Sequence, residues 1–276
     1  MATSSNGTLA GMEVLARCNV RVTGRAGAPP IVFAHGFGCD QTRWRKVAPE
    51  FERDHHVVLF DLVGSGGSDL ASYDPDRYVS LEAYAADVLA LCRELELQDV
   101  VFVGHSVSAM IGVLAQIAEP ERFAALVLVG PSARYLDDRD YAGGFSEADI
   151  AELLELMDSN HLGWQDPLAG MVMANPDRPE LKTEVEASFC RTRPDIARQF
   201  ARTTFLGDNR EDLRRVTVPT LVLQTSQDTI APLTAGAFVH DQIPDSRMVV
   251  IEGQGHCPHL SAPSETATAI REFLSA

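Results

Sequence analysis

Three residues that could share one reaction follow three separate apolar runs of the chain: Ser106, Asp228 and His256. A serine hydroxyl is a weak nucleophile at neutral pH, and it becomes effective when a neutral imidazole accepts its proton. The imidazole in turn needs a carboxylate that fixes its tautomer and stabilises its charged form. We therefore predict that Ser106 is a nucleophile, that His256 is its base and that Asp228 orients the base.

The segment around Ser106 has the residues of a sharp strand-to-helix turn. An apolar run (100–103) precedes it, and a stretch with helical periodicity follows at once. Such a turn strains the backbone of the nucleophile and requires small residues two positions away on either side, which here are Gly104 and Ser108. The commonest form of the motif has glycine in place of Ser108. On the motif alone, a buried turn with an incidental serine remains an alternative.

Attack of a serine on a carbonyl group leaves negative charge on the carbonyl oxygen, and fixed donors must meet that charge. The backbone N–H groups of Val107, next to Ser106, and of Phe37, after His35-Gly36, are in the positions expected of an oxyanion hole. Loss of one such donor typically slows the reaction about 10²–10³-fold. We predict that these N–H groups stabilise the transition state.

Two other motifs compete for these roles. Asp61 also ends an apolar run, but it precedes Ser106 and lies in a glycine-rich segment, where a carboxylate commonly accepts bonds from backbone N–H groups. The run His256-Cys257-Pro258-His259 contains metal-ligand types, yet no third ligand cluster accompanies it and Pro258 excludes a helical i, i+3 face. We therefore favour Asp228 as the carboxylate, and we expect neither a metal nor a cofactor.

The apolar periodicity supplies the elements that would bring these residues together. Right-handed crossovers between parallel strands place every strand-to-helix loop at one edge of the sheet. Stretches with helical periodicity lie between the apolar runs of the chain, and one of them covers residues 41–52. Apolar and polar residues alternate weakly at 13–22, which indicates edge strands. The fold class is therefore α/β, with a mostly parallel central sheet flanked by helices. Runs typical of buried strands occur at 31–34, 57–60, 100–103, 125–129, 219–224 and 248–251.

Between residues 132 and 212 the alternation of strands and helices stops. Ser146 and Asp149 form a capping-box pattern, and stretches with helical periodicity follow. This segment is typical of a helical insertion within one domain. We predict a first core segment at 1–132, a helical cap at 133–212 and a second core segment at 213–276.

The composition excludes several classes of function. The chain has 276 residues and a formal net charge of −16, which repels nucleic acid and anionic lipid and favours a small neutral ligand. We find no basic and apolar leader and no run of about 18 apolar residues that would predict a membrane span. The five cysteines are scattered without a C-x-x-C pattern, so we expect a reducing compartment. A cytoplasmic protein that binds neither nucleic acid nor membranes is the expectation.

Several motifs together resemble one branch of the α/β-hydrolases, which contains the bacterial RsbQ-type proteins and the plant karrikin and strigolactone receptors. The motifs span almost the whole chain, and Ser108 is usual in this branch. They are HGFGCDQ (35–41), FDLVGSG (60–66), GHSVSAMIG (104–112), GPS (130–132), RYL (134–136), GGF (143–145), RQF (198–200) and GHCPHL (255–260).

The resemblance implies an α/β-hydrolase fold with a cap of four helices, arranged as a V over a deep apolar pocket. It implies slow hydrolysis of a small apolar ligand with an ester or lactone carbonyl. Leu168 departs from the plant receptors, which tend to have an aromatic residue there, and this argues against a strigolactone-type ligand. By motif position, the residues implied to line the pocket are Phe37, Tyr135, Phe145, Leu153, Trp164 and Phe205.

In the bacterial members the resemblance further implies a role upstream of a stress-response phosphatase. We therefore expect a serine hydrolase of small esters or lactones. The alternative is a ligand-sensing signalling protein, in which hydrolysis is slow and the docking of a partner, such as a phosphatase, is the output.

Overall fold

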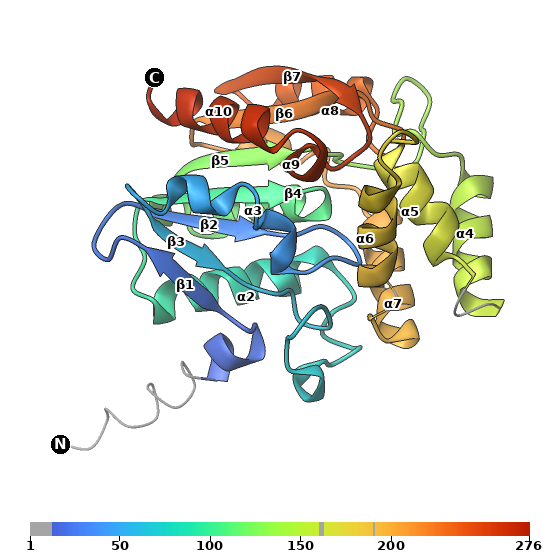
Figure 1. Ribbon diagram of the computed structural model, residues 1–276, viewed down its shortest axis with the longest axis horizontal. Coiled ribbons are helices and arrows are strands. Elements are labelled where there is room, and N and C mark those ends of the chain that lie inside the picture. The colour runs from blue at the N-terminus through green and yellow to red at the C-terminus, as the bar shows by residue number, and fades with distance from the viewer. Residues whose placement is uncertain (1–12, 160–162, 190) are drawn as a thin grey trace.

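The computed structural model describes residues 13–159, 163–189 and 191–276. A seven-stranded sheet runs through its centre (Figure 1). The strands are β1 Arg21–Gly24, β2 Pro30–Ala34, β3 His56–Leu59, β4 Val100–His105, β5 Phe123–Val129, β6 Thr220–Gln227 and β7 Ser246–Gln254. Their order is β1-β3-β2-β4-β5-β6-β7, and only the β1–β3 pair of this sheet is antiparallel. The mostly parallel sheet predicted from the apolar runs is confirmed.

Two apolar cores lie on opposite faces of this sheet because successive side chains of a strand alternate between its faces. Val32 and Phe102 belong to one core, whereas Phe33 and Val103 belong to the other. The first face is covered by α2 Leu81–Glu94, α3 Val107–Ala118 and α8 Leu233–Gln242. The second is covered by α10 Pro263–Leu274 and the short 3₁₀ helices η1 Gln41–Trp44 and η2 Ala48–Phe51. The remaining short helices are η3 Leu70–Ser72, η4 Pro120–Arg122, η5 Leu213–Arg215 and α9 Pro258–Ser261.

Four helices between β5 and β6 lie beyond the carboxyl edge of the sheet (Figure 1): α4 Glu147–Ser159, α5 Gln165–Met173, α6 Pro179–Phe189 and α7 Pro194–Phe205. They pack as two pairs, α4 against α7 and α5 against α6. The predicted capping box is present, because Asp149 N donates to Ser146 Oγ at 3.2 Å and Ser146 N donates to the Asp149 carboxylate at 2.8 Å. The V arrangement and the domain boundaries stay predictions. Within the described ranges, none of the helices is both long and apolar enough to cross a membrane.

Two predicted elements were wrong. Residues 41–52 form the separate 3₁₀ helices η1 and η2 and not one α-helix, because Asp40 caps the first by accepting a bond from Thr42 N and Pro49 in the second has no N–H for an α-helical ladder. Residues 13–17 are helical, and the edge strand begins only at Arg21. The helical turn is explained by Val14 and Cys18, which are both buried and joined by a 3.0 Å backbone bond.

Candidate active site

Ser106 lies at the tip of a strained turn between β4 and α3. Its backbone has φ 58° and ψ −123°, a conformation that costs energy in any residue except glycine. The turn is held by a 2.8 Å bond from Ser106 N to Val129 O. It also requires Gly104, because a Cβ atom there would lie 2.4 Å from the carbonyl oxygen of Ser108. The local sequence therefore presents the serine hydroxyl at the carboxyl edge of the sheet.

Ser106, His256 and Asp228 meet at this edge, although they come from three loops. His256 Nε2 is 2.7 Å from Ser106 Oγ, and His256 Nδ1 is 2.7 Å from Asp228 Oδ2. The other oxygen of Asp228 accepts bonds from Ile230 N and Ala231 N at 2.8 and 3.0 Å, which fixes the carboxylate. Since the carboxylate accepts the Nδ1 proton, Nε2 is left free to accept the serine proton.

The loop that carries His256 is tied to the cap. His256 N donates to Val172 O in α5 at 2.7 Å. The preceding Gly255 has φ +90°, and a Cβ atom there would lie 2.1 Å from Met173 O. Only glycine allows α5 to approach this closely, so the cap itself helps to place the imidazole.

The two backbone segments predicted to form an oxyanion hole border Ser106. Val107 is the first residue of α3, and N–H groups in the first turn of a helix have no acceptor within the helix. Phe37 follows Gly36, where a Cβ atom would lie 3.2 Å from Ser106 Cβ. The positive end of the α3 dipole also favours negative charge at this point. An oxygen bound at Ser106 would therefore lie beside both segments.

An apolar cavity of about 30 Å³ lies against Ser106 and His256. Phe37, Tyr135 and Phe205, three of the residues predicted to line a pocket, border it. For the other bordering residues of the cap, helical periodicity indicated buried faces but not which members of each face lie over Ser106. The other bordering residues are Cys39, His105, Leu168, Val172, Phe189, Thr204, Ile230 and Cys257.

Tyr135 has a closer role than a wall residue. Its hydroxyl is 3.1 Å from Ser106 Oγ, and its ring packs edge-on against Phe205 at 5.2 Å. Burial raises the pKa of Tyr135, so the phenol stays neutral. A neutral hydroxyl at this position can donate a hydrogen bond to an oxygen atom at the nucleophile.

The other three predicted pocket residues border a different space. Phe145, Leu153 and Trp164 line a groove of about 560 Å³ between α4 and α5. Leu168 borders both this groove and the inner cavity. The Trp164 ring is 6.1 Å from the Phe37 ring, so Trp164 packs beside the segment predicted to contribute to an oxyanion hole. The structure thus divides the predicted lining into an inner and an outer set.

Two further histidines lie beneath His256. His105 Nε2 donates to the carbonyl oxygen of His256 at 2.9 Å, and the rings of His105 and His259 are 4.4 Å apart. Burial holds the pKa of both imidazoles well below the usual value, and the charge of Arg43 lowers the pKa of His259 further. Both rings are therefore neutral at physiological pH.

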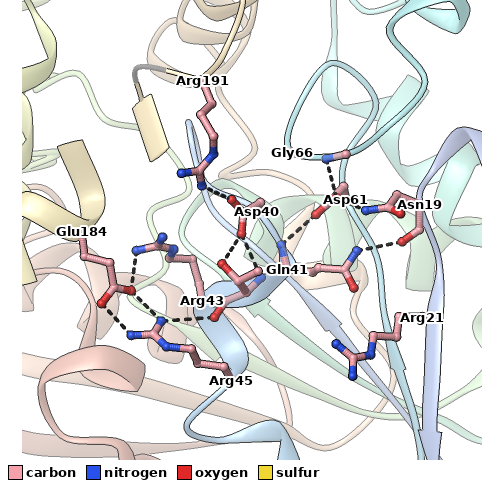
Figure 2. Close-up of a pocket in the computed structure, with 12 residues that line it drawn as sticks. Asn19, Arg21, Asp40, Gln41, Arg43, Arg45, Asp61, Gly66, Glu184 and Arg191 are labelled. Carbon is pink, nitrogen blue, oxygen red and sulfur yellow. Dashed lines mark hydrogen bonds and ion pairs between the residues drawn. The ribbon is translucent and has the colours of Figure 1, made fainter. Parts of the chain in front are cut away.

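Ion pairs tie cap helix α6 to the core at a polar groove of about 900 Å³ (Figure 2). Glu184 accepts from Arg43 Nη1 at 2.7 Å and from the two terminal nitrogens of Arg45 at 2.5 and 2.6 Å. Arg191 pairs with Asp40 at 2.5 Å. Burial opposes ionisation of Glu184, but its bond from Arg45 and the charge of Arg43 outweigh burial and lower its pKa. These pairs hold the cap beside the segment that contains Phe37.

Asp61, the rival carboxylate, lies in the same groove and accepts bonds from its own turn and from two other segments of the chain. It accepts from Gln41 N at 2.8 Å and from Asn19 Nδ2 at 2.7 Å (Figure 2). It also accepts from Gly67 N at 2.8 Å. The structure therefore gives Asp61 the backbone-satisfying role favoured for it above.

A serine on an elbow after a central parallel strand, with its carboxylate and histidine in later loops, defines the α/β-hydrolase class of proteins. The chain belongs to this class: the model of the Alpha/beta hydrolase family matches residues 31–269.

Several relatives of the chain lie in the karrikin and strigolactone branch predicted from the motifs. It is 38% identical to "Strigolactone esterase RMS3" of Pisum sativum, over 96% of this chain and 99% of the relative. It is 37% identical to "Karrikin insensitive 2 receptor IA" of Petunia hybrida, over 93% of both chains. Among solved structures, the hydrolase olei00960 from Oleispira antarctica matches with a TM-score of 0.93 and 38% identity, over 96% of this chain and 97% of that one. The predicted resemblance to the karrikin and strigolactone receptor branch is confirmed.

Proposed function

We propose that this chain hydrolyses small apolar esters or lactones, with Ser106 as nucleophile, His256 as general base and Asp228 as the carboxylate that orients the base. The observation that carries the proposal is the buried hydrogen-bond chain, in which both links, Asp228 to His256 and His256 to Ser106, are 2.7 Å long. The similarity to a relative named as an esterase supports the same reaction class.

The steps follow from these contacts. Ser106 Oγ attacks the carbonyl carbon while His256 Nε2 takes its proton, and Asp228 stabilises the imidazolium. The oxygen that becomes negative meets the N–H groups of Val107 and Phe37, and the imidazolium then donates its proton to the leaving alkoxide. Water, activated by the same imidazole, releases the acyl group from Ser106. In a lactone the acyl and alkoxide parts belong to one molecule, and the product is a hydroxy acid.

The lining indicates a neutral substrate. The inner cavity is bordered by Phe37, Tyr135 and Phe205, which offer apolar surface and one phenol. Its small volume suits the reacting carbonyl with few further atoms, and the outer groove at Leu153 and Trp164 would hold the remainder of a longer substrate. A charged ligand would lose its hydration without a paired charge on these walls.

Replacement of the nucleophile tests the proposal. Ser106→Ala should lower hydrolysis of p-nitrophenyl acetate by about 10⁴-fold or more, because loss of a triad serine removes the acyl-enzyme route. Ser275→Ala, which changes an exposed serine after α10, should hydrolyse the ester at the unmodified rate. Equal melting temperatures would show that both variants fold. Undiminished activity of Ser106→Ala would contradict the proposal.

A ligand-sensing role is the second candidate, and the similarity to a protein named as a karrikin receptor favours it. In this case hydrolysis is slow, and a signalling partner binds the cap in its ligand-bound state. For the bacterial members of the branch, the resemblance implies that this partner is a phosphatase. The described cysteines, which are free and buried, support a reducing compartment such as the cytoplasm. A γ-lactone should then raise the melting temperature of Ser106→Ala and change its binding to a co-encoded phosphatase. If the lactone changes neither, the sensing role is wrong.

A further inference from the structure

A second group of chemically active side chains lies directly beneath the proposed base. It consists of His105 at the end of β4, and of Cys257 and His259 at the start of α9. One ligand atom of each lies within 4.8 Å of the other two. Cys257 Sγ is 3.9 Å from His105 Nε2, and the centres of the two imidazoles are 4.4 Å apart. All three side chains are buried, with His259 fully inaccessible.

Hydrogen bonding does not account for these nitrogens. Both ring nitrogens of His259, and Nδ1 of His105, are buried without a hydrogen-bond partner among the described residues. Buried polar atoms of this kind are rare in folded proteins, because each costs the hydration it has lost. The Trp44 ring packs on His259 at 4.5 Å and holds the imidazole in place. The cluster therefore brings two neutral imidazoles and one thiol together in a buried position.

The sequence contained two of these ligand types in the run 256–259, and it lacked a third. The fold supplies the third, since His105 lies 152 positions before Cys257 in the chain and yet contacts it. Pro258 does not prevent this arrangement, because the third ligand comes from β4 and not from the next turn of a helix.

We propose that His105, Cys257 and His259 form a binding site for a soft monovalent cation, Cu(I) or its redox-inert analogue Ag(I). Two imidazoles and a thiolate are soft donors, and no carboxylate of the set would favour a hard cation such as Mg²⁺. The thiolate is the only anion among the three, so a monovalent ion leaves the complex neutral. A divalent ion would leave a net positive charge in a buried place that already feels the charge of Arg43.

Binding forms bonds from the ion to sulfur and nitrogen, and the thiol proton of Cys257 leaves to the solvent. The proton that His105 Nε2 now donates to the carbonyl oxygen of His256 moves to Nδ1, so that Nε2 can bind the ion through its lone pair. The ion is neither oxidised nor reduced. It reaches the site through the inner cavity, which both His105 and Cys257 border together with Ser106. Each ligand atom must move by roughly 1 Å, because metal bonds of about 2.0–2.3 Å place such donors closer together than they now lie.

Occupation of this site should inhibit the reaction proposed for Ser106, so the inhibition rests on the proposed function, whereas the binding does not. His105 Nε2 holds the carbonyl oxygen of His256 at 2.9 Å. An ion that takes Nε2 removes this bond, and the main chain of His256 loses its anchor. The imidazole would then leave its position against Ser106.

The test measures Ag(I) binding directly, by native mass spectrometry and by metal analysis after gel filtration, in a Cys190→Ser background because Cys190 lies outside the described residues. We expect one ion per chain. Loss of a residue that hydrogen-bonds to a metal ligand lowers metal affinity about 10–100-fold. Loss of a direct ligand, in Cys257→Ser or His259→Gln, should therefore lower the affinity for Ag(I) about 100-fold or more. Cys92→Ser, a buried thiol in α2, should keep the affinity of the background protein.

The outcomes separate the site from simple thiol binding. If His259→Gln or His105→Gln binds Ag(I) as tightly as the background protein, the three-ligand site is wrong. The same conclusion follows if Cys39→Ser loses as much affinity as Cys257→Ser, because Cys39 borders the same cavity. Melting curves identify any variant that does not fold, and the other nitrogen ligand then serves as the test. Stoichiometric binding without inhibition of ester hydrolysis would retain the site and overturn its coupling to His256.

Discussion

Replacement of Glu184 by glutamine would remove the charge that ties α6 to the core. Its carboxylate neutralises Arg43, whose side chain is only 4% exposed, and Arg45, whose side chain is 43% exposed. In Glu184→Gln the guanidinium of Arg43 stays buried and loses its charged partner, although the amide oxygen can still accept one bond. The variant should therefore unfold more easily, and the two arginines should contribute unequally to the loss.

The magnitude follows from the exposure of each partner. Removing one member of a fully buried ion pair costs about 3–5 kcal/mol, whereas exposed pairs contribute about 0–1 kcal/mol. The Glu184 side chain is 25% exposed, so water weakens the penalty. We expect Glu184→Gln to lower the free energy of unfolding by about 2 kcal/mol, and Arg45→Gln to lower it by less than about 1 kcal/mol.

Urea unfolding at neutral pH, followed by tryptophan fluorescence, measures both changes as shifts of the midpoint at constant slope. The double variant Arg43→Gln/Glu184→Gln should lose less unfolding free energy than the two single variants lose in sum. The reason is that Arg43→Gln removes the charge that Glu184→Gln leaves unpaired. Equal losses for Glu184→Gln and Arg45→Gln, or additive losses in the double variant, would refute the reasoning from burial.

Two substitutions test the site, and one labelling experiment tests the burial of the cysteines. Tyr135→Phe removes the hydroxyl beside Ser106. Because one neutral hydrogen bond contributes about 1 kcal/mol, kcat for p-nitrophenyl acetate should fall about fivefold with little change in KM. A fall of 100-fold would assign Tyr135 to proton transfer instead. Leu168→Ala opens the wall between the two cavities, so kcat/KM for p-nitrophenyl butyrate should rise relative to that for the acetate, while stability falls by about 2–3 kcal/mol. An unchanged ratio would mean that the cavities do not join at Leu168. Burial raises the pKa of every described cysteine, to about 11 for Cys39, so the thiols stay protonated at pH 8. Alkylation by iodoacetamide, mapped by peptide mass spectrometry, should be at least roughly 100-fold slower than in urea, and equal rates would contradict the burial of Cys18, Cys39, Cys92 and Cys257.

The central strands and the order of the reactive loops could be predicted because these strands are buried on both faces and read as short apolar runs. All residues of β4 are buried, and the run 100–103 marks it in the sequence. Parallel topology then brings the loops that carry Ser106, Asp228 and His256 to one edge, whatever the side-chain details are.

The reasoning fails where local and tertiary effects compete. Apolar spacing at 41–52 fits an α-helix, but the cap at Asp40 and the missing N–H of Pro49 divide it into two short 3₁₀ helices.

The cap could be predicted only as a set of helices. Periodicity identifies a buried face for each helix, but not the helix on which that face packs. Phe189 therefore could not be distinguished from other core aromatics, although it borders the inner cavity and its ring lies 6.2 Å from that of Phe37. Likewise Trp164 and Leu153, expected in the ligand pocket, border the outer groove. The motif RYL indicated Tyr135 as a pocket residue but not its contact with Ser106, which depends on how the chain leaves β5.

The volumes of the two cavities have a consequence for how any substrate reaches Ser106. The inner cavity, of about 30 Å³, is much smaller than the outer groove, of about 560 Å³. An ester of even a few carbon atoms must therefore displace side chains between them, and Leu168 is the residue common to both. Since Leu168 and Val172 are on α5, and Val172 O accepts from His256 N, a movement of α5 that admits substrate also moves the backbone of the base. Entry of a substrate and the position of the proposed base are then coupled through one helix.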